Sequence, residues 1–228
     1  MANDVRDALI VLTHPRSPIA EAYRSLRTNL EFSSLDQPLK TLIVTSAAPG
    51  EGKSTVLANL AVTMAQADKR VILVDCDLRR PAQHRLFGIS NEAGLTTMLR
   101  DDRALERPPL RETGVPHLAL LPSGPLPPNP SELLGSRRMG EIMEALLERA
   151  DIVLFDAPPV IAVTDAQVLA SRVDGVLLVL SAGKTKREHA QRAMALLEKV
   201  NARLVGTVLN NVRLDMALYR YYSGREEV

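Results

Sequence analysis

Short apolar runs alternate along this chain with longer stretches in which apolar residues recur every three or four positions. The short runs predict β-strands at residues 41–46, 71–75, 117–123, 151–156, 175–181 and 204–210. The longer stretches predict helices at residues 18–32, 53–67, 131–149, 165–172 and 186–200. Strands that are apolar throughout and alternate with helices are typical of a parallel sheet covered on both faces. The pattern therefore predicts a single α/β domain with a mostly parallel, twisted sheet.

Composition argues against some classes of binding partner and metal site. The 228 residues carry 28 Lys and Arg against 27 Asp and Glu, so the net charge of +1 gives no general attraction for nucleic acid. Aromatic residues make up only 3%, which also disfavours a stacking surface for single strands. Cys76 is the only cysteine, so neither an internal disulfide nor a multi-cysteine metal site can form. Acidic residues stand where an export signal needs basic ones, and we expect a cytoplasmic protein.

The strongest motif follows the first predicted strand. Residues 47–55 read AAPGEGKST, which is the phosphate-binding pattern G-x-x-x-x-G-K-[ST] with alanine at the first glycine position. Small residues here let backbone N–H groups turn inward around a phosphate, and the following helix adds its N-terminal dipole. Lys53 would neutralise the β- and γ-phosphates of ATP, and the Ser54 hydroxyl would ligate Mg²⁺. The predicted nucleotide-binding residues of this loop are Ala48, Pro49, Gly50, Glu51, Gly52, Lys53, Ser54 and Thr55.

Acidic residues end two of the predicted buried strands. Asp75 and Asp77 lie at the end of one strand, and Asp156 lies at the end of another. In an open parallel sheet the ligand lies beyond the carboxyl ends of the strands, so we expect these carboxylates to converge on the phosphate loop. Carboxylates beside a triphosphate need a cation between them, which predicts Mg²⁺ held by Ser54, Asp77 and Asp156. Asp75 is then free to accept a proton from a hydroxyl nucleophile, so the predicted catalytic residues are Lys53, Asp75 and Asp77.

Two further positions each have two interpretations. Arg79 follows the aspartate pair, and it would either contact a phosphate or form a structural salt bridge. Asn210 ends the last predicted strand, where its amide would either contact the adenine edge or cap a loop. Both residues are candidates for nucleotide binding.

Several segments, which follow one another along the chain in the family's order, resemble the bacterial tyrosine kinases, the P-loop family that works in capsule and exopolysaccharide synthesis. Residues 47–55, 71–79 and 152–159 match the family's Walker A, Walker A′ and Walker B motifs. The family's E-x-x-R-x-x-R oligomerisation motif is matched by Glu21, Arg24 and Arg27. Residues 127–134 resemble its P-P-N-P-x-E-L-L segment. The tail resembles its C-terminal tyrosine cluster of phosphoacceptors, with Tyr219, Tyr221 and Tyr222.

The resemblance implies a fold like that of the MinD and ParA ATPases, with MgATP as phosphoryl donor and protein tyrosine as acceptor. It implies a kinase domain over residues 1–212, with an oligomerisation helix near 18–32, and a flexible tyrosine-rich tail over 213–228. In a ring-like homo-oligomer, one subunit would phosphorylate the tail of the next. The implied partners are a transmembrane polysaccharide co-polymerase, which activates the kinase at the inner face of the membrane, and a cognate tyrosine phosphatase. The implied role is regulation of exopolysaccharide or capsule synthesis.

Other functions on the same fold would require residues that this chain lacks. A nucleotide-switched positioning ATPase of the MinD and ParA type would carry a signature lysine near the start of the loop, where this chain has Ala48. An iron–sulfur carrier would need more cysteines than Cys76. Without the resemblance, Glu21, Arg24 and Arg27 would be a solvated helix face with an intrahelical ion pair, because residues three apart share one side of a helix.

Overall fold

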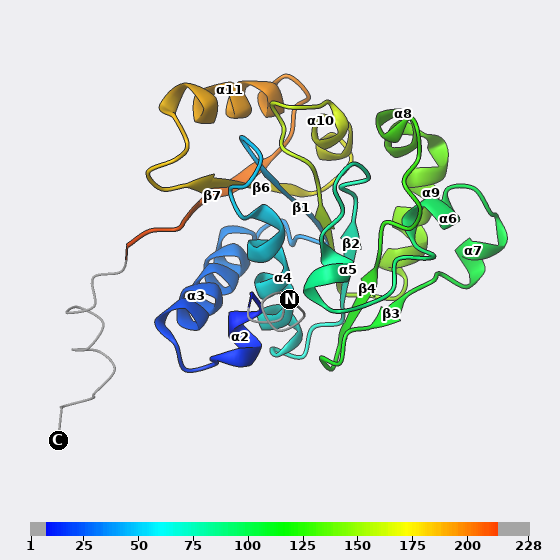
Figure 1. The fold of residues 1–228 in the computed structure, drawn as a ribbon, viewed down its shortest axis with the longest axis horizontal. Helices are drawn as coiled ribbons and strands as arrows, with labels where there is room; N and C mark the ends of the chain where they lie inside the picture. Colours follow the sequence, from blue (N-terminus) through cyan, green and yellow to red (C-terminus); the bar gives the residue numbers. More distant parts are fainter. Residues whose placement is uncertain (1–7, 214–228) are drawn as a thin grey trace.

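The computed structural model describes residues 8–213, which form a seven-stranded sheet flanked by helices (Figure 1). The strand order is β3-β4-β2-β5-β1-β6-β7, and all neighbours pair in parallel except β3 with β4. The strands are β1 Thr41–Ser46, β2 Val71–Asp75, β3 Arg111–Glu112, β4 Leu118–Leu121, β5 Ile152–Asp156, β6 Gly175–Ser181 and β7 Leu204–Asn210. The predicted mostly parallel α/β sheet is confirmed, and only the short, exposed β3 has no counterpart in the prediction.

The helices lie on both faces of the sheet (Figure 1). The longer ones are α3 Pro18–Ser33, α4 Lys53–Ala65, α9 Arg137–Leu147 and α11 Arg187–Glu198. The shorter ones are α2 Ile10–Thr13, α5 Gln83–Leu86, α6 Leu95–Met98, α7 Arg103–Glu106, α8 Pro130–Gly135 and α10 Asp165–Ala170. Among residues 8–213, no helix combines the length and the apolar character needed to cross a bilayer.

Successive side chains of a strand point to opposite faces of the sheet and pack in two separate hydrophobic cores. Leu42 and Val44 of β1 pack in one core with apolar residues of α3 and α4. Ile43, between them in sequence, points to the opposite face and packs in the other core with residues of α9, α10 and α11. The strands β1, β2, β5 and β6 are therefore buried on both sides, which explains why their sequences are apolar throughout rather than alternating.

Local signals set the helix ends. Ser17 caps α3, since its Oγ accepts a hydrogen bond from the backbone N–H of Ala20 at 3.1 Å, and Pro18 occupies the first turn. The helix predicted over residues 131–149 is wrong in one respect, because it is two helices, α8 and α9. Ser136 breaks it with an extended backbone (φ −68°, ψ 160°), and its Oγ caps α9 by accepting from the N–H of Met139 at 3.3 Å.

The sheet order brings the predicted functional segments together. Strand β5 lies between β1 and β2, with Asp75 opposite Asp156 and Val44 opposite Asp156 in register. The carboxyl ends of these three strands therefore meet at one edge, where β1 continues into the phosphate loop and α4. This is the edge at which open parallel sheets bind ligands.

Candidate active site

The phosphate loop between β1 and α4 has a backbone that requires glycine at two positions. Gly50 and Gly52 have φ angles of 73° and 89°, a region that residues with a Cβ rarely adopt. A Cβ on Gly52 would also lie only 2.2 Å from Nδ2 of Asn210. Ala47 stands at the first glycine position of the pattern and is fully buried against the core. The loop has the cradle shape that phosphate binding needs.

Glu51, in the middle of this loop, is buried and fastens the loop to its neighbours. Its carboxylate accepts a hydrogen bond from the backbone N–H of Ala48 at 2.9 Å and another from the hydroxyl of Thr185. Its carbonyl oxygen accepts from Nδ2 of Asn210 at 3.0 Å. Of the two interpretations of Asn210, the structure shows the loop cap. Thr185 lies in the segment between β6 and α11, and sequence reasoning missed it because no motif marks it.

Lys53 places its ammonium group between two carboxylates. Its Nζ lies 3.0 Å from Oδ2 of Asp77, 3.2 Å from Oδ1 of Asp156 and 3.0 Å from Oγ of Ser54. Burial alone would lower the pKa of Lys53, but Asp156 and Asp77 outweigh it and hold the pKa above its ordinary value. The predicted convergence of strand-end carboxylates on the loop is therefore found, and a cation lies among them.

Asp75 occupies a different environment from the one we expected of a free proton acceptor. Its side chain is fully buried, and its oxygens accept backbone N–H groups of Asp77 at 3.2 Å, and of Ala82 and Gln83 both at 2.9 Å. Burial, together with the Asp156 carboxylate, raises the pKa of Asp75 above its ordinary value. Asp75 thus braces the turn after β2, whereas Asp77 lines the open cavity beside the loop.

Gln83 of α5 is a site residue that the sequence did not reveal. Its Nε2 donates to Oδ2 of Asp156 at 2.8 Å and to the backbone carbonyl of Ser54 at 3.1 Å. Gln83 is fully buried, and its Oε1 has no hydrogen-bond partner within residues 8–213. The side chain links β5 to the start of α4 and fixes the orientation of the Asp156 carboxylate. No motif or periodicity marks this glutamine, because it lies in a single helical turn.

Arg79 forms the structural salt bridge rather than presenting a free guanidinium. Its Nε lies 2.9 Å from Oδ2 of Asp165, and its Nη2 lies 3.1 Å from Oδ1 of the same carboxylate. Asp165 is fully buried at the start of α10, and its Oδ1 also accepts the hydroxyl of Ser131 at 3.0 Å. This ion pair joins the β2 turn to α8 and α10, and a contact of Arg79 with the nucleotide stays a prediction.

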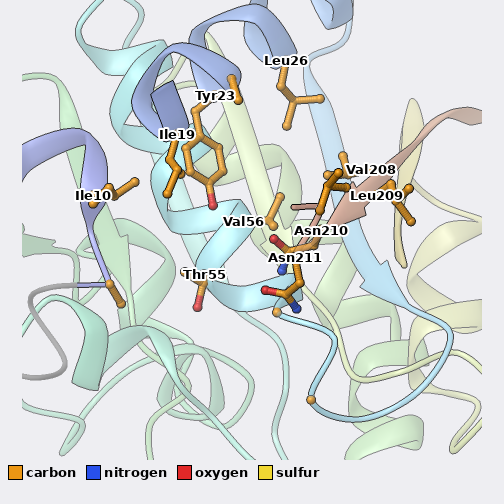
Figure 2. A pocket seen from close by; sticks show the side chains of 15 residues that line it. Ile10, Ile19, Tyr23, Leu26, Thr55, Val56, Val208, Leu209, Asn210 and Asn211 are labelled. Carbon is orange, nitrogen blue, oxygen red and sulfur yellow. The ribbon is translucent and has the colours of Figure 1, made fainter. Parts of the chain in front are cut away.

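Two cavities flank the phosphate loop. One, of about 540 Å³, is lined by Lys53, Ser54 and Asp77. The other, of about 490 Å³, lies beyond Thr55 and is mostly apolar. Figure 2 shows this second cavity between Ile19, Tyr23 and Leu26 of α3, Val56 of α4, and Asn210 and Asn211 at the end of β7. Burial raises the pKa of Tyr23 to about 12, so its hydroxyl stays protonated.

The donor groups fit a magnesium ion that arrives with a nucleotide. Ser54, Asp77 and Asp156 offer hydroxyl and carboxylate oxygens, which Mg²⁺ prefers. Within residues 8–213 there is no group of three His, Cys, Asp or Glu side chains able to hold a metal by themselves. Phosphate oxygens and water would therefore have to complete an octahedral shell, as is usual for Mg²⁺ at phosphate sites.

The predicted oligomerisation residues divide between two environments. Arg24 donates from Nη1 to Oε2 of Glu21 at 2.6 Å within the exposed part of α3. Arg27 instead packs inward, and its Nη1 donates to the backbone carbonyl of Thr63 in α4 at 2.9 Å. Arg27 thus holds α3 against α4 within one chain. The predicted phosphoacceptors in the tail lie outside the described residues.

The fold and site define a P-loop NTPase of the ParA type. A family model described as "ParA: NUBPL iron-transfer P-loop NTPase" matches residues 38–218. The fold also resembles the septum site-determining protein MinD of Pyrococcus horikoshii complexed with Mg-ADP, with a TM-score of 0.63 and 23% identity over 75% of this chain and 69% of that one. The chain therefore has a nucleotide-binding fold.

Within that class, the chain belongs to the bacterial tyrosine kinases. It is 43% identical to tyrosine-protein kinase YwqD of Bacillus subtilis (strain 168), over 96% of this chain and 92% of that protein. Tyrosine-protein kinase CpsD of Streptococcus agalactiae is 36% identical over 89% of this chain and 87% of its own length. The crystal structure of the chimerical protein CapA2B2 superposes with a TM-score of 0.87 and 38% identity, covering 91% of both chains. The protein is a protein-tyrosine kinase, as the sequence predicted.

Proposed function

We propose that this kinase uses MgATP to phosphorylate the tyrosines of its own C-terminal tail, and thereby regulates capsule or exopolysaccharide synthesis. The proposal rests mainly on one observation: beside the phosphate loop, the buried ammonium group of Lys53 lies between the carboxylates of Asp77 and Asp156. Two carboxylates this close to a phosphate cradle are stabilised by a positive charge between them, because their mutual repulsion is strong in a buried site.

The chain's own residues supply the binding functions. Backbone N–H groups of the loop from Ala48 to Thr55 would hold the phosphates, assisted by the N-terminus of α4. Lys53 would exchange its two carboxylate partners for the β- and γ-phosphates, because its flexible side chain can reach either. Mg²⁺ held by Ser54, Asp77 and Asp156 would neutralise charge on the phosphates. Phosphoryl transfer depends largely on such positioning and charge stabilisation.

Two aspartates compete for the role of proton acceptor from the incoming tyrosine. Burial raises the pKa of Asp75 to about 8, so its carboxylate is a strong base but is largely protonated near neutral pH, and three backbone N–H groups engage it. Asp77 lines the cavity that a tyrosine side chain would enter, but it pairs with Lys53 and is also a proposed metal ligand. We retain Asp75 as the proposed base. For Asp75 to accept the tyrosine proton, the turn after β2 must open when nucleotide and acceptor bind.

The apolar cavity between α3, α4 and β7 is suited to the adenine ring. It begins at Thr55, at the end of the phosphate cradle away from Asp77, and it is walled by Tyr23 and Val56 (Figure 2). Asn210 and Asn211 provide amide groups at its rim, and such groups can hydrogen-bond a base edge. Asn210 would contact the base only by loosening its bond to the Glu51 carbonyl.

The proposed assembly and location rest on the resemblance to the family, which implies a transmembrane co-polymerase as the activating partner. A solved structure similar to this chain is a chimera named CapA2B2. Glu21 and Arg24 form an exposed ion pair within one chain. In a ring, each of the two side chains could instead pair with a residue of opposite charge on the neighbouring subunit. The kinase would then work at the inner face of the membrane, where a cognate phosphatase resets the tail.

A mixing experiment tests the proposal. A Lys53→Met chain, unable to transfer phosphate, is incubated with MgATP and active protein in which Tyr219, Tyr221 and Tyr222 are Phe. Phosphotyrosine on the Lys53→Met tail is expected, with a rate that rises with protein concentration. An unmodified Lys53→Met tail, under conditions in which the wild-type protein phosphorylates itself, would contradict transfer between subunits.

Iron transfer, named in the matching family model, has no support in this chain. Cys76 is fully buried beside Asp75, and burial raises the pKa of its thiol well above the ordinary value. A neutral, enclosed thiol is a poor metal ligand. A nucleotide-switched positioning ATPase would instead give ATP hydrolysis without phosphotyrosine in the same mixing experiment.

A further inference from the structure

A basic groove opens next to the cavity that contains Lys53 and Asp77. It has a volume of about 510 Å³, and its walls include Arg80, His84, Arg85, Asn91, Gly124 and Leu126. We call it the arginine groove. Within residues 8–213, none of the side chains that line it is acidic. The groove is therefore a concave surface that carries positive charge only.

The groove is continuous with the proposed phosphoryl-transfer site. Arg79, Arg80 and Arg85 line both the groove and the cavity of Lys53 and Asp77. The backbone N–H of Arg80 also donates to Oδ1 of Asp77 at 2.9 Å, which fixes the start of the groove to the active site. An extended peptide with its tyrosine in the transfer site can thus continue directly between these arginines.

Two of the three arginines carry charges that no acidic residue of the described chain neutralises. Arg79 is paired with Asp165. Arg80 and Arg85 are exposed, and neither forms an ion pair within residues 8–213. The only side-chain hydrogen bond of Arg85 there is to the backbone carbonyl of Pro81, at 2.9 Å. The guanidinium groups of Arg80 and Arg85 are therefore available to carboxylates of a bound peptide.

The charge of the groove does not depend on its histidine. Burial, together with the neighbouring Arg85, lowers the pKa of His84, so this side chain is neutral at physiological pH. Arginine remains protonated throughout the pH range in which proteins are folded. The groove consequently attracts acidic groups at every pH at which a kinase would work.

We propose that the arginine groove selects acceptor tyrosines that are followed by acidic residues, and that its occupant here is the end of another copy's tail. This inference rests on the proposed function. In the sequence, Glu226 and Glu227 follow Tyr222 by four and five residues. An extended chain spans roughly 3.3 Å per residue, so about 13 Å separates Tyr222 from the first of these carboxylates. With Tyr222 in the transfer cavity, these carboxylates would come within reach of Arg80 and Arg85, which line both the cavity and the groove.

The test compares two synthetic peptides as substrates of the full chain. One has the sequence of residues 214–228, and the other carries Glu226→Gln and Glu227→Gln. We expect the substituted peptide to have a KM about 3- to 10-fold higher, the size that two partly exposed charge pairs provide. The difference should shrink as NaCl is raised, because salt screens exposed charges. The wild-type enzyme is used, so this comparison does not depend on the folding of a variant.

Enzyme variants locate the effect. In a chain with Arg80→Gln and Arg85→Gln, the two peptides should have the same KM. The matched control is Arg192→Gln, because Arg192 is exposed on α11 and does not line the groove. This variant should still distinguish the two peptides.

Three different results would each refute a different statement. Equal KM values for both peptides with the wild-type enzyme would refute the groove and leave the kinase intact. A rise in the KM for ATP alone in the arginine variant would assign Arg80 and Arg85 to the nucleotide. Absence of phosphotyrosine on both peptides and on the chain itself would refute the proposed function.

Discussion

Lys53 and Asp156 form a buried ion pair across 103 positions of sequence, with Nζ 3.2 Å from Oδ1. The Asp156 side chain is fully buried, and that of Lys53 is only 11% exposed. With Asp77 on its other side, the lysine of the phosphate loop holds the place where a metal bound between these carboxylates would lie. Before nucleotide binds, Lys53 therefore stabilises the fold by neutralising the two buried carboxylates.

Lys53→Met should lower stability as well as abolish activity. Removing one partner of a buried ion pair leaves uncompensated charge, and the free energy of unfolding should fall by about 3 kcal/mol. Mg²⁺ should raise the melting temperature of this variant more than that of the wild type, because it replaces the missing cation. Thermal unfolding with and without Mg²⁺ measures both effects.

The matched control is Lys69→Met, which removes an exposed ion pair with Glu31. Such surface pairs contribute about 0–1 kcal/mol, so this variant should unfold nearly as the wild type does. Equal losses in the two variants, or no response of Lys53→Met to Mg²⁺, would show that Lys53 is not the counterion of the carboxylates.

The three aspartates should separate by function. Asp75→Asn should keep nucleotide affinity but reduce phosphoryl transfer by about 10²- to 10⁴-fold, as loss of a general base does. Asp77→Asn and Asp156→Asn should raise the Mg²⁺ concentration needed for half-maximal activity. Nucleotide titrations and turnover at varied Mg²⁺ measure these effects. If Asp77→Asn lost transfer at saturating Mg²⁺ while Asp75→Asn retained it, the base would be Asp77.

Thr185→Val should loosen the phosphate loop. The substitution removes the hydroxyl that bonds the buried Glu51 carboxylate and leaves that carboxylate with the Ala48 N–H as its remaining partner. A lost hydrogen bond to a charged group amounts to about 1.5 kcal/mol, so the KM for ATP should rise roughly 10-fold. The value of kcat should change less, since binding is affected in the ground state and the transition state alike.

Thr207→Val is the control for this change, because Thr207 is exposed on β7 and makes no side-chain hydrogen bond within residues 8–213. The same shift in both threonine variants would mean that the tie between Glu51 and Thr185 does not position the loop.

The two arginines of α3 should behave differently. Arg27→Ala should lower the free energy of unfolding by about 1–3 kcal/mol, because it removes a charged hydrogen bond to the Thr63 carbonyl and the packing of its stem. Arg24→Ala should leave the melting temperature within a degree or two and instead reduce the mass in solution. Light scattering and thermal unfolding of each variant distinguish the roles. An Arg24→Ala protein with unchanged mass would remove the support for assembly through this helix.

The sequence was sufficient for features that depend on local pattern. The strands β1, β2, β5 and β6 are buried along nearly their whole length, so their apolar runs are long enough to recognise. The phosphate loop could be located because Gly50, Gly52 and Lys53 must stand at fixed spacing for a backbone cradle to form. The convergence of Asp77 and Asp156 followed from the topology of parallel sheets.

Contacts that depend on the packing of distant elements could not be predicted. The partner of Arg79 is Asp165, 86 positions away, and the partner of Glu51 is Thr185, 134 positions away. Gln83 reaches Asp156 only because the turn after β2 folds back over β5. The break at Ser136 was missed because the apolar spacing continues across it, although serine is a common helix cap.

Mapping phosphorylation by mass spectrometry after incubation with MgATP tests the central claim most directly. Intact mass reports how many phosphoryl groups are added, and peptide fragmentation reports where they are. The chain has four tyrosines, and Tyr23 in the folded domain provides an internal reference. We predict phosphate on Tyr219, Tyr221 or Tyr222, none on Tyr23, and none on the Lys53→Met protein. Release of inorganic phosphate from ATP with all four tyrosines unmodified would contradict the account.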